Sequence, residues 1–405
     1  MANSRYRDPK TFGKKTLVLV MVATIGASAI MVNDIAITPA ADFMFGAYGD
    51  ATNFILSGPS LLMIPAALVT GVLLKHFSKK TIFVIGALLF TIGGLSCSFV
   101  LDSALFVCAM RAIIGLSVGM VASCCTALIA ESFIDENKRG TMMGLWNAGM
   151  AVLGMVIGLA AAALVDESWQ SVFKLYWMAV PILIVIVFCV PRTAPEKHAV
   201  PEQAEAAVSG EEGKMPWGRL LGNMAVYFVS MVILCGFYFL NAVYGADAGI
   251  GTASLAGIAA TCINVGTLIG CLAFGLIYAK TKRFVLFEYF VLLAISYLLL
   301  AFAPSAATCL VAAVLLGVGN ALGMSYFQTR VTVIVPPNQV SLALSVSMAT
   351  LGIAQFCSTY FATFVMGVFP GGTMLTFSMA SAAILVVGAV AAAVFSFVHK
   401  SRVDA

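Results

Sequence analysis

Two ionisable residues, Asp34 and Arg111, lie deep inside long apolar runs of the sequence. A charged side chain at the centre of a bilayer costs about 2.5–3.5 kcal/mol on insertion scales, and such residues commonly serve transport. Asp34 precedes Asp42, and Arg111 follows Asp102, with Asp42 and Asp102 at the predicted outer ends of their runs. At a helical rise of about 1.5 Å per residue, both side chains reach roughly 12–14 Å below the same surface. We therefore expect Asp34 and Arg111 to meet.

Such a pair supports two roles. It can be a static ion pair that locks the N-terminal half of the protein. Alternatively, Asp34 takes up and releases a proton while Arg111 exchanges between Asp34 and a substrate. A neighbouring guanidinium lowers the pKa of a carboxyl group and desolvation raises it, so opening and closing the pair would drive protonation. A potential of 100 mV supplies about 2.3 kcal/mol per charge. We favour proton coupling, with the static pair as the alternative.

The composition requires a lipid environment for these residues. Of the 405 residues, 61% are hydrophobic and 10% are charged, whereas a soluble domain carries about 25% charged residues. The apolar side chains are too many to be hidden from water in a globule, so they must face lipid. The net charge of +4 is small and scattered, which argues against a nucleic-acid partner.

Apolar runs of about 20 residues are long enough to cross a bilayer as helices. Helices are required because lipid cannot satisfy backbone N–H and C=O groups, and the runs lack the alternation of a membrane barrel. The predicted spans are 16–40, 53–74, 81–101, 104–130, 140–165, 173–190, 220–243, 254–279, 284–303, 305–329, 340–365 and 373–398.

The positions of the basic residues predict the orientation. With a cytoplasmic N-terminus, all but two of the 22 Lys and Arg residues fall on the inner side. The exceptions are Arg111 and Lys174, and the outer loops carry acidic residues instead. This asymmetry follows the positive-inside rule. It predicts a multi-pass protein of the cell (inner) membrane with both termini in the cytoplasm.

A polar, Pro- and Glu-rich segment, 191–219, divides the predicted spans six and six. Such a composition is typical of a flexible linker. We therefore predict an N-terminal six-helix bundle over 1–190, a cytoplasmic linker over 191–219 and a C-terminal six-helix bundle over 220–405.

The two halves share landmarks at an offset of 204 residues. Gly71 matches Gly275, and two glycines of the fourth span match two of the tenth, which gives the pairs Gly115 with Gly319 and Gly119 with Gly323. Small residues let membrane helices approach closely, so these glycines are predicted to serve helix packing. Repeated halves with a site between them at the midplane are typical of secondary transporters. The predicted fold class is an all-α membrane protein with twelve transmembrane helices in two pseudo-symmetric six-helix bundles.

Two motifs resemble those of a known family. The loop after the second span reads G-V-L-L-K-H-F-S-K-K from Gly71 to Lys80 and is similar to the G-x-L-a-D-r-x-G-R-K signature of the major facilitator superfamily. The fourth span carries R-A-I-I-G-L-S-V-G from Arg111, similar to that family's R-x-x-x-G-x-x-x-G. The resemblance implies that the first and fourth spans face a central cavity. It also implies a cytoplasmic gate motif, here Gly71, Lys75, Lys79 and Lys80.

The chain departs from the family pattern in three places. Lys75 stands where the signature has Asp, and Ser78 stands where it has a second Gly, so Lys75 could instead reach Glu131 or Asp135. The antiporter-type ending of the fifth helix, G-x-x-x-G-P, has Met155 in place of the proline. This weakens the interpretation as an antiporter without excluding it.

The repeat assigns the charge chemistry to the N-terminal half, because Asp34 maps to Tyr238 and Arg111 to Leu315. The C-terminal half is then expected to offer polar and aromatic contacts to the substrate. The candidates for substrate binding are Tyr238, Asn241, Asn264 and Gln355, with Asn147 from the fifth span. The alternative for each amide is a hydrogen bond that joins two helices.

These observations favour a secondary active transporter of small organic solutes, coupled to protons, that works by alternating access. Export is favoured, since the family's drug-exporting branches pair an Asp of the first span with the Arg of the fourth. The alternative is uptake of a metabolite or organic anion, with Arg111 binding a carboxylate; a more remote one is a membrane receptor that does not transport. None of the three histidines lies in a span, and no nucleotide or zinc motif is present. We therefore expect no cofactor, no metal and no enzymatic activity, and a monomer with solute, protons and lipid as partners.

Overall fold

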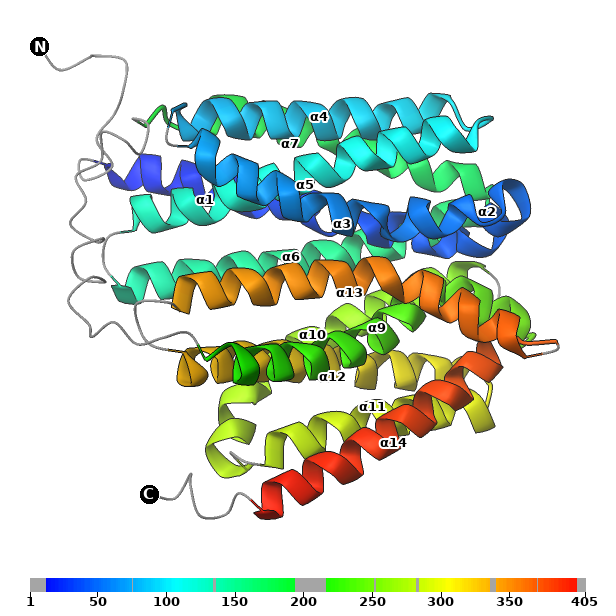
Figure 1. The fold of residues 1–405 in the computed structure, drawn as a ribbon. Coiled ribbons are helices and arrows are strands. Elements are labelled where there is room, and N and C mark those ends of the chain that lie inside the picture. The colour runs from blue at the N-terminus through cyan, green and yellow to red at the C-terminus, as the bar shows by residue number, and fades with distance from the viewer. Residues whose placement is uncertain are drawn as a thin grey trace, which may run out of the picture. The chain divides into compact units, whose positions relative to one another are not determined.

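Helices make up every secondary-structure element in the part of the chain that the computed structural model describes (Figure 1). That part comprises residues 12–74, 76–133, 136–193, 216–250, 253–281, 284–335, 340–369 and 371–398. Within it, twelve helices are long and apolar enough to cross a membrane. The predicted all-α membrane fold with twelve spans is confirmed.

The residues group by their mutual contacts into two units, Met1–Ile37 with Met44–Glu205 and Thr38–Phe43 with Ala206–Ala405. The division falls inside the segment 191–219, most of which lies outside the described residues. The elements up to the division are α1 (Lys14–Met31), η2 (Asn33–Ala36), η3 (Thr38–Ala40), α2 (Ala41–Tyr48), α3 (Ala51–Leu73), α4 (Lys79–Phe99), α5 (Ala104–Ser132), α6 (Glu136–Val165), η4 (Trp169–Met178) and α7 (Ala179–Cys189). Those after it are α9 (Trp217–Asp247), α10 (Ala253–Thr281), α11 (Val285–Phe302), α12 (Ala306–Ile334), α13 (Val340–Val368) and α14 (Met374–Val398).

Equivalent helices have equivalent neighbours in the two units. In the first unit α3 packs along α5, α4 along α7 and α1 along α6. In the second unit α10 packs along α12, α11 along α14 and α9 along α13, so each pair repeats with its sequence-related partner (Figure 1). The two six-helix bundles are therefore pseudo-symmetric.

The predicted first span, 16–40, is not one helix. α1 ends at Met31, and the short 3-10 helices η2 and η3 follow it. The side-chain Nδ2 of Asn33 donates to the carbonyl of Ile30 at 2.8 Å, a local bond that competes with helix continuation. Pro39 lacks a backbone N–H and restricts the residue before it. The α-helix therefore ends just before the polar residues Asn33 and Asp34.

The predicted sixth span, 173–190, is also divided. Its first part belongs to the 3-10 helix η4 and its second part to the α-helix α7. The η4 helix begins after Ser168, whose hydroxyl accepts a hydrogen bond from the backbone N–H of Ser171 at 3.2 Å. This N-terminal cap explains where η4 begins. Tyr176 lies on η4 and is buried in the first unit.

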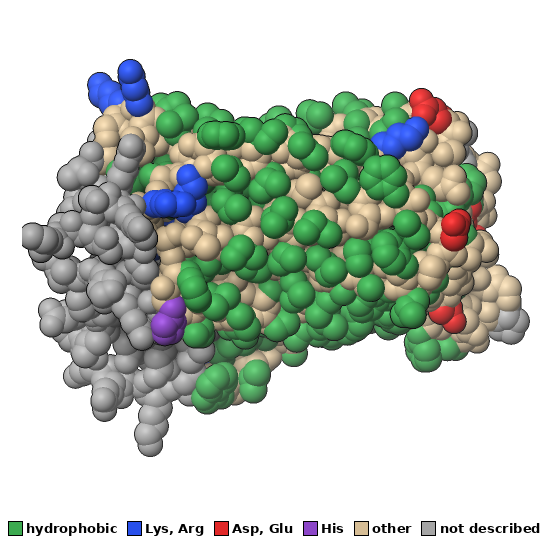
Figure 2. All heavy atoms as spheres, turned by 90° about the horizontal axis from the view of Figure 1, so that it is seen from above, with side chains coloured by type: hydrophobic (Ala, Val, Ile, Leu, Met, Phe, Trp, Pro, Cys, Tyr) green, Lys and Arg blue, Asp and Glu red, His purple; other side chains and the backbone are tan. Residues whose placement is uncertain are grey.

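Large apolar side chains cover the outward faces of the helices. Leu105, Phe188 and Leu272 are 81%, 78% and 75% exposed, respectively. The face drawn in Figure 2 carries a broad hydrophobic band, with most of the visible Lys and Arg side chains at one end and the Asp and Glu side chains at the other. Such a band on long apolar helices suits a lipid environment. The chain is a multi-pass membrane protein.

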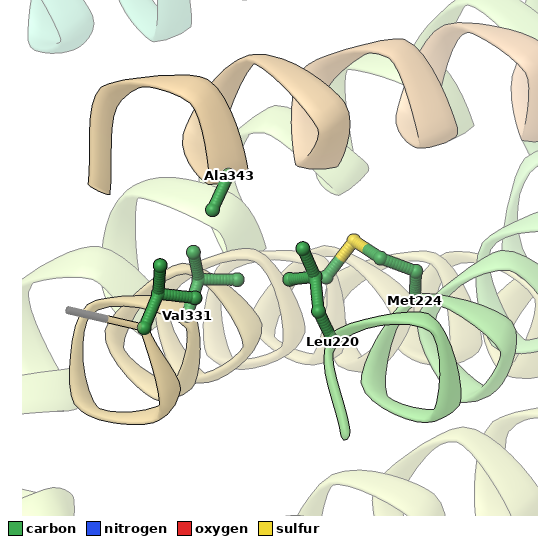
Figure 3. Packing of buried hydrophobic residues seen from close by; sticks show 5 residues of the cluster. Leu220, Met224, Val331 and Ala343 are labelled. Carbon is green, nitrogen blue, oxygen red and sulfur yellow. The ribbon is translucent and has the colours of Figure 1, made fainter. Parts of the chain in front are cut away.

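Three helices of the second unit meet in a small apolar core near the start of α9. Leu220 and Met224 of α9 pack with Val331 of α12, Val335 after its end and Ala343 of α13 (Figure 3). All five side chains are at most 4% exposed. This core joins the start of α9, the end of α12 and the start of α13.

Candidate functional site

A proline in α3 prepares the binding site of Arg111. Pro59 has no backbone N–H, so the carbonyl of Ile55, four residues earlier, has no helical donor at that position. Arg111 of α5 fills this vacancy, since its Nε donates to the Ile55 carbonyl at 2.6 Å. The neighbouring carbonyl of Leu56 accepts from Arg111 Nη2 at 3.3 Å. Backbone groups released by a membrane-helix proline are satisfied here by a side chain.

Two neutral side chains complete the surroundings of Nη1. This nitrogen donates to Asn33 Oδ1 at 2.9 Å and to the hydroxyl of Tyr176 at 2.8 Å. The Tyr176 hydroxyl donates in turn to Asn33 Oδ1 at 3.4 Å. The ring of Tyr176 lies edge-on to Phe90, with centroids 5.7 Å apart. Tyr176 therefore links η4 and α4 to the arginine.

The structure brings Asp34 and Arg111 together. Arg111 Nη2 donates to Asp34 Oδ1 in a short ion pair. The side chain of Arg111 is 0% exposed, whereas that of Asp34 is 18% exposed. The carboxylate is therefore the member of the pair that reaches the surface of its unit. Asp34 lies on η2, a short 3-10 turn after the end of α1.

Glycines bring α5 against α3 at this site. A Cβ atom on Gly115 would lie 2.6 Å from the carbonyl oxygen of Pro59. A Cβ atom on Gly119 would meet the carbonyl of Met63 and lie 2.8 Å from Ala66 Cβ. The two glycines follow Arg111 at intervals of one helical turn, so the face that carries the guanidinium also carries the close contact.

The equivalent glycines of the second unit pack differently. Gly319 faces Leu293, and Gly323 faces the ring of Tyr289, both on α11. The glycine of α12 that lies against α10 is Gly317, where a Cβ atom would meet the carbonyl of Ile263. Ile263 is the repeat equivalent of Pro59, so the glycine match in this helix pair is displaced by two residues from the predicted offset of 204. With this correction Arg111 corresponds to buried Ala313, which is again uncharged.

The polar candidates for substrate binding have different surroundings. Asn147 of α6 is exposed, and Tyr238, Asn264 and Gln355 are half-buried. Asn264 Nδ2 donates to the carbonyl of Ala260 in its own helix at 2.8 Å. The ring of Tyr238 lies edge-on to Phe239 at 5.1 Å.

Asn241 differs from the other candidates. It is 2% exposed, and neither Nδ2 nor Oδ1 has a hydrogen-bond partner among the described residues. The preceding residue, Leu240, has non-helical φ and ψ of −112° and 22°, so α9 is kinked beside the amide. Buried amides without partners are rare and costly.

The structure describes three of the four residues of the predicted gate motif. Gly71 is exposed at the end of α3, Lys80 is half-buried, and Lys75 lies outside the described residues. Glu131 of α5 is paired with buried Lys79, with Nζ and Oε2 3.2 Å apart. The sequence suggested Lys75 as a partner of Glu131 or Asp135; both Lys75 and Asp135 lie outside the described residues.

One acid outside the spans has a perturbed pKa. Burial raises the pKa of Asp42 above its ordinary value of 3.8, and the negative charge of Asp247 raises it further. Asp247 Oδ2 accepts a hydrogen bond from the backbone N–H of Met374, at the start of α14, at 2.6 Å. In the described part of the chain, no group of three or more His, Cys, Asp or Glu residues could hold a metal ion.

Sequence reasoning missed Asn33, Tyr176 and the carbonyls of Ile55 and Leu56. A signal existed for Ile55, because Pro59 in an apolar helix frees the carbonyl four residues before it. Asn33 is the polar neighbour of Asp34 in the sequence. No comparable signal marked Tyr176, which reaches Arg111 through the tertiary packing of η4.

Comparisons with known proteins agree with this architecture. Residues 18–251 match the family described as Major Facilitator Superfamily. The methylenomycin A resistance protein of Bacillus subtilis is 27% identical over 188 residues, which cover 45% of this chain. The chain spans only 37% of that relative's length. The multidrug resistance protein MdtL of Escherichia coli O81 is 24% identical over 302 residues, which cover 73% of this chain and 74% of that protein.

The fold has solved counterparts. The crystal structure of the nucleoside transporter NupG, in a mutant form, aligns with a TM-score of 0.72 and 13% identity over 94% of this chain and 99% of the other. At that identity the likeness shows the fold alone. Together with the family match over more than half of the sequence, these findings establish that the chain belongs to the Major Facilitator Superfamily.

Proposed function

We propose that this chain is a proton-coupled secondary transporter that moves small organic solutes across the cell inner membrane by alternating access. Both termini lie in the cytoplasm in this proposal, as the distribution of basic residues predicts. One observation carries the proposal: a membrane-depth carboxylate, partly exposed, is paired with an arginine that is fully buried. Intramembrane acid–base pairs of this kind commonly form proton pathways.

Asp34 is the proton-carrying group in this mechanism. Its carboxylate is stabilised by the Arg111 guanidinium, and a proton that neutralises the carboxylate weakens that attraction. The side chain of Asp34 is then free to change its position relative to Arg111. The proton gradient thus biases one conformation over another, which is what coupling requires.

Export is the direction that the proposal favours. Two relatives are named for resistance to methylenomycin A and to multiple drugs, and removal of a toxic compound from the cell is a direct route to resistance. The alternative, uptake of an anion bound by Arg111, has less support. Arg111 is wholly buried, and each of its N–H groups has an acceptor within its own unit.

Asn241 is the most promising substrate contact among the polar candidates. Its amide offers one donor pair and one acceptor, which none of the described residues uses. The kink at Leu240 lies beside it, and broken helices often build binding sites in transporters. Tyr238, Asn264, Gln355 and Asn147 remain candidates for the same role.

The proposal is tested with the purified full chain in proteoliposomes. A panel of neutral, cationic and anionic organic solutes is screened under an imposed pH gradient, with and without a proton ionophore. We expect at least one solute to accumulate only while the gradient is maintained. Solute fluxes that are the same with and without the ionophore would contradict proton coupling.

A further inference from the structure

The guanidinium of Arg111 has five N–H groups, and the structure supplies five acceptors for them. Four are neutral, namely the carbonyls of Ile55 and Leu56, Asn33 Oδ1 and the Tyr176 hydroxyl. Only one is charged, the carboxylate of Asp34. Loss of the negative charge on Asp34 therefore leaves four fifths of the hydrogen bonding of Arg111 in place.

Burial divides the network into an inner and an outer part. Arg111 and Tyr176 are 0% exposed and Asn33 is 1% exposed, while the Asp34 side chain is 18% exposed. An unpaired buried cation is very unfavourable, but hydrogen bonds to neutral dipoles offset part of its desolvation. The four neutral acceptors form an inner seat for the cation, and Asp34 lies at its open side.

The seat is itself anchored to α1 and α4. Asn33 Nδ2 donates to the Ile30 carbonyl at the end of α1, and the Tyr176 hydroxyl donates to Asn33 Oδ1. The backbone of Gly94 lies so close to Tyr176 that a Cβ atom there would be 2.7 Å from the ring. The hydroxyl of Tyr176 is thereby fixed in front of Nη1.

We propose that Tyr176 and Asn33 are positioning residues that keep Arg111 seated as a fixed cation while Asp34 gains and loses its proton. This inference rests on the proposed coupling function and revises one part of the mechanism expected from the sequence. Arg111 does not swing between Asp34 and the substrate. If it left the seat, four hydrogen bonds would break and their buried acceptors would lose this donor. The partly exposed side chain of Asp34 is the partner that moves, while the backbone of η2 stays in place with Asn33.

The seat is tested first without any transport assay. Thermal unfolding of the full chain in detergent is measured for wild type, Asp34→Asn, Tyr176→Phe and the double variant. When Asp34 no longer supplies a charge, Arg111 depends on its neutral acceptors, so Tyr176→Phe lowers the melting temperature more in the Asp34→Asn background than in wild type. Additive shifts in the two backgrounds would overturn the inference. This result does not depend on whether the protein couples solute to protons.

The second test is the pH profile of transport. Without the Tyr176 hydroxyl, Nη1 loses a neutral acceptor and the guanidinium relies more on the charged carboxylate of Asp34. We expect Tyr176→Phe to move the pH of half-maximal transport down by about 0.5–1 unit. Tyr244→Phe is the matched control, since Tyr244 is equally buried and its hydroxyl donates to the Leu300 carbonyl at 2.8 Å in the second unit. A uniform loss of transport at every pH, with the same midpoint as wild type, would contradict a positioning role.

Discussion

Gly115 of α5 lies against the backbone of Pro59 in α3, one helical turn from Arg111. A Cβ atom at position 115 would be 2.6 Å from the Pro59 carbonyl oxygen and 2.7 Å from its Cα. This contact holds α5 close enough to α3 for Arg111 to reach the carbonyl that Pro59 frees. Helix packing and the seating of the cation therefore depend on the same pair of residues.

Gly115→Ala should destabilise the protein, because the added methyl group meets backbone atoms that cannot rotate away. Overpacking of this kind costs about 1–3 kcal/mol, so thermal unfolding in detergent should shift down by several degrees. Gly71→Ala is the control, since a Cβ atom at Gly71 has no heavy atom within 4 Å. Equal melting temperatures for the two variants would show that α3 and α5 are not in tight contact at Gly115.

Pro59→Ala restores a backbone N–H that competes with Arg111 for the Ile55 carbonyl. Loss of a hydrogen bond to a charged group costs about 1.5–3 kcal/mol of stability, and the replacement of a helix-interior proline by alanine offsets this by about 3 kcal/mol. Because the guanidinium beside Asp34 loses a fixed contact, gradient-driven transport should fall about tenfold or more. The melting temperature should be kept or raised, since alanine is favoured within a helix. Pro65→Ala is the control, because Pro65 lies in the same helix and is exposed. Similar transport by both variants would argue against the role of Pro59.

The Asn241→Leu variant tests whether the Asn241 amide binds substrate or only stabilises the fold. Neither amide atom has a partner among the described residues, so an apolar side chain of similar size should stabilise the protein by about 1–3 kcal/mol. Transport should be lost if the amide binds substrate. Asn264→Leu is the control, because that amide already donates to its own helix. A lower melting temperature for Asn241→Leu would mean that the amide is already satisfied in the folded protein.

Asp42→Asn should change how stability depends on pH. The pKa of Asp42 is raised in the folded protein, so the folded state binds this proton more tightly than the unfolded state. Stability is therefore lost as the pH rises from 3.8 through the raised pKa. Asp42→Asn removes that loss, so the variant should melt above wild type at pH 7 and equal to it well below pH 3.8.

The matched control for Asp42→Asn is Asp50→Asn, which removes a carboxylate from an exposed position just after α2. A difference between Asp42→Asn and wild type that persists at the acid end, or that has the opposite sign at pH 7, would contradict the burial of the Asp42 charge.

The fold could be predicted from the sequence because each span carries its own signal. A run of about 20 apolar residues must be helical in lipid, whatever surrounds it. The breaks inside spans were harder to predict. The end of α1 at Met31 depends on a side-chain hydrogen bond of Asn33. The kink at Leu240 could not be predicted from a nearby proline, because the surrounding sequence has none.

The site could be predicted only in part. A lone acid and a lone base at equal depth were enough to pair Asp34 with Arg111, since few other charges are available at that depth. The remaining partners of Arg111 are neutral, and polar side chains and carbonyls are too common in helices to identify by type. Tyr176 lies 65 residues from Arg111 in the sequence, and the tertiary packing of η4 against α4 and α6 brings them together. Tertiary packing also decides which glycine of α12 lies against α10. The predicted offset of 204 pointed to Gly319, whereas the glycine in that contact is Gly317, two residues earlier.

The most direct test of the account is the solute accumulation that Asp34→Asn supports in proteoliposomes with an imposed pH gradient. The asparagine keeps an acceptor for Arg111, so the variant should fold and still equilibrate solute down its concentration gradient. It should not accumulate solute against that gradient, whereas wild type should. An Asp34→Asn variant that reaches the wild-type accumulation ratio would show that Asp34 does not carry the coupled proton.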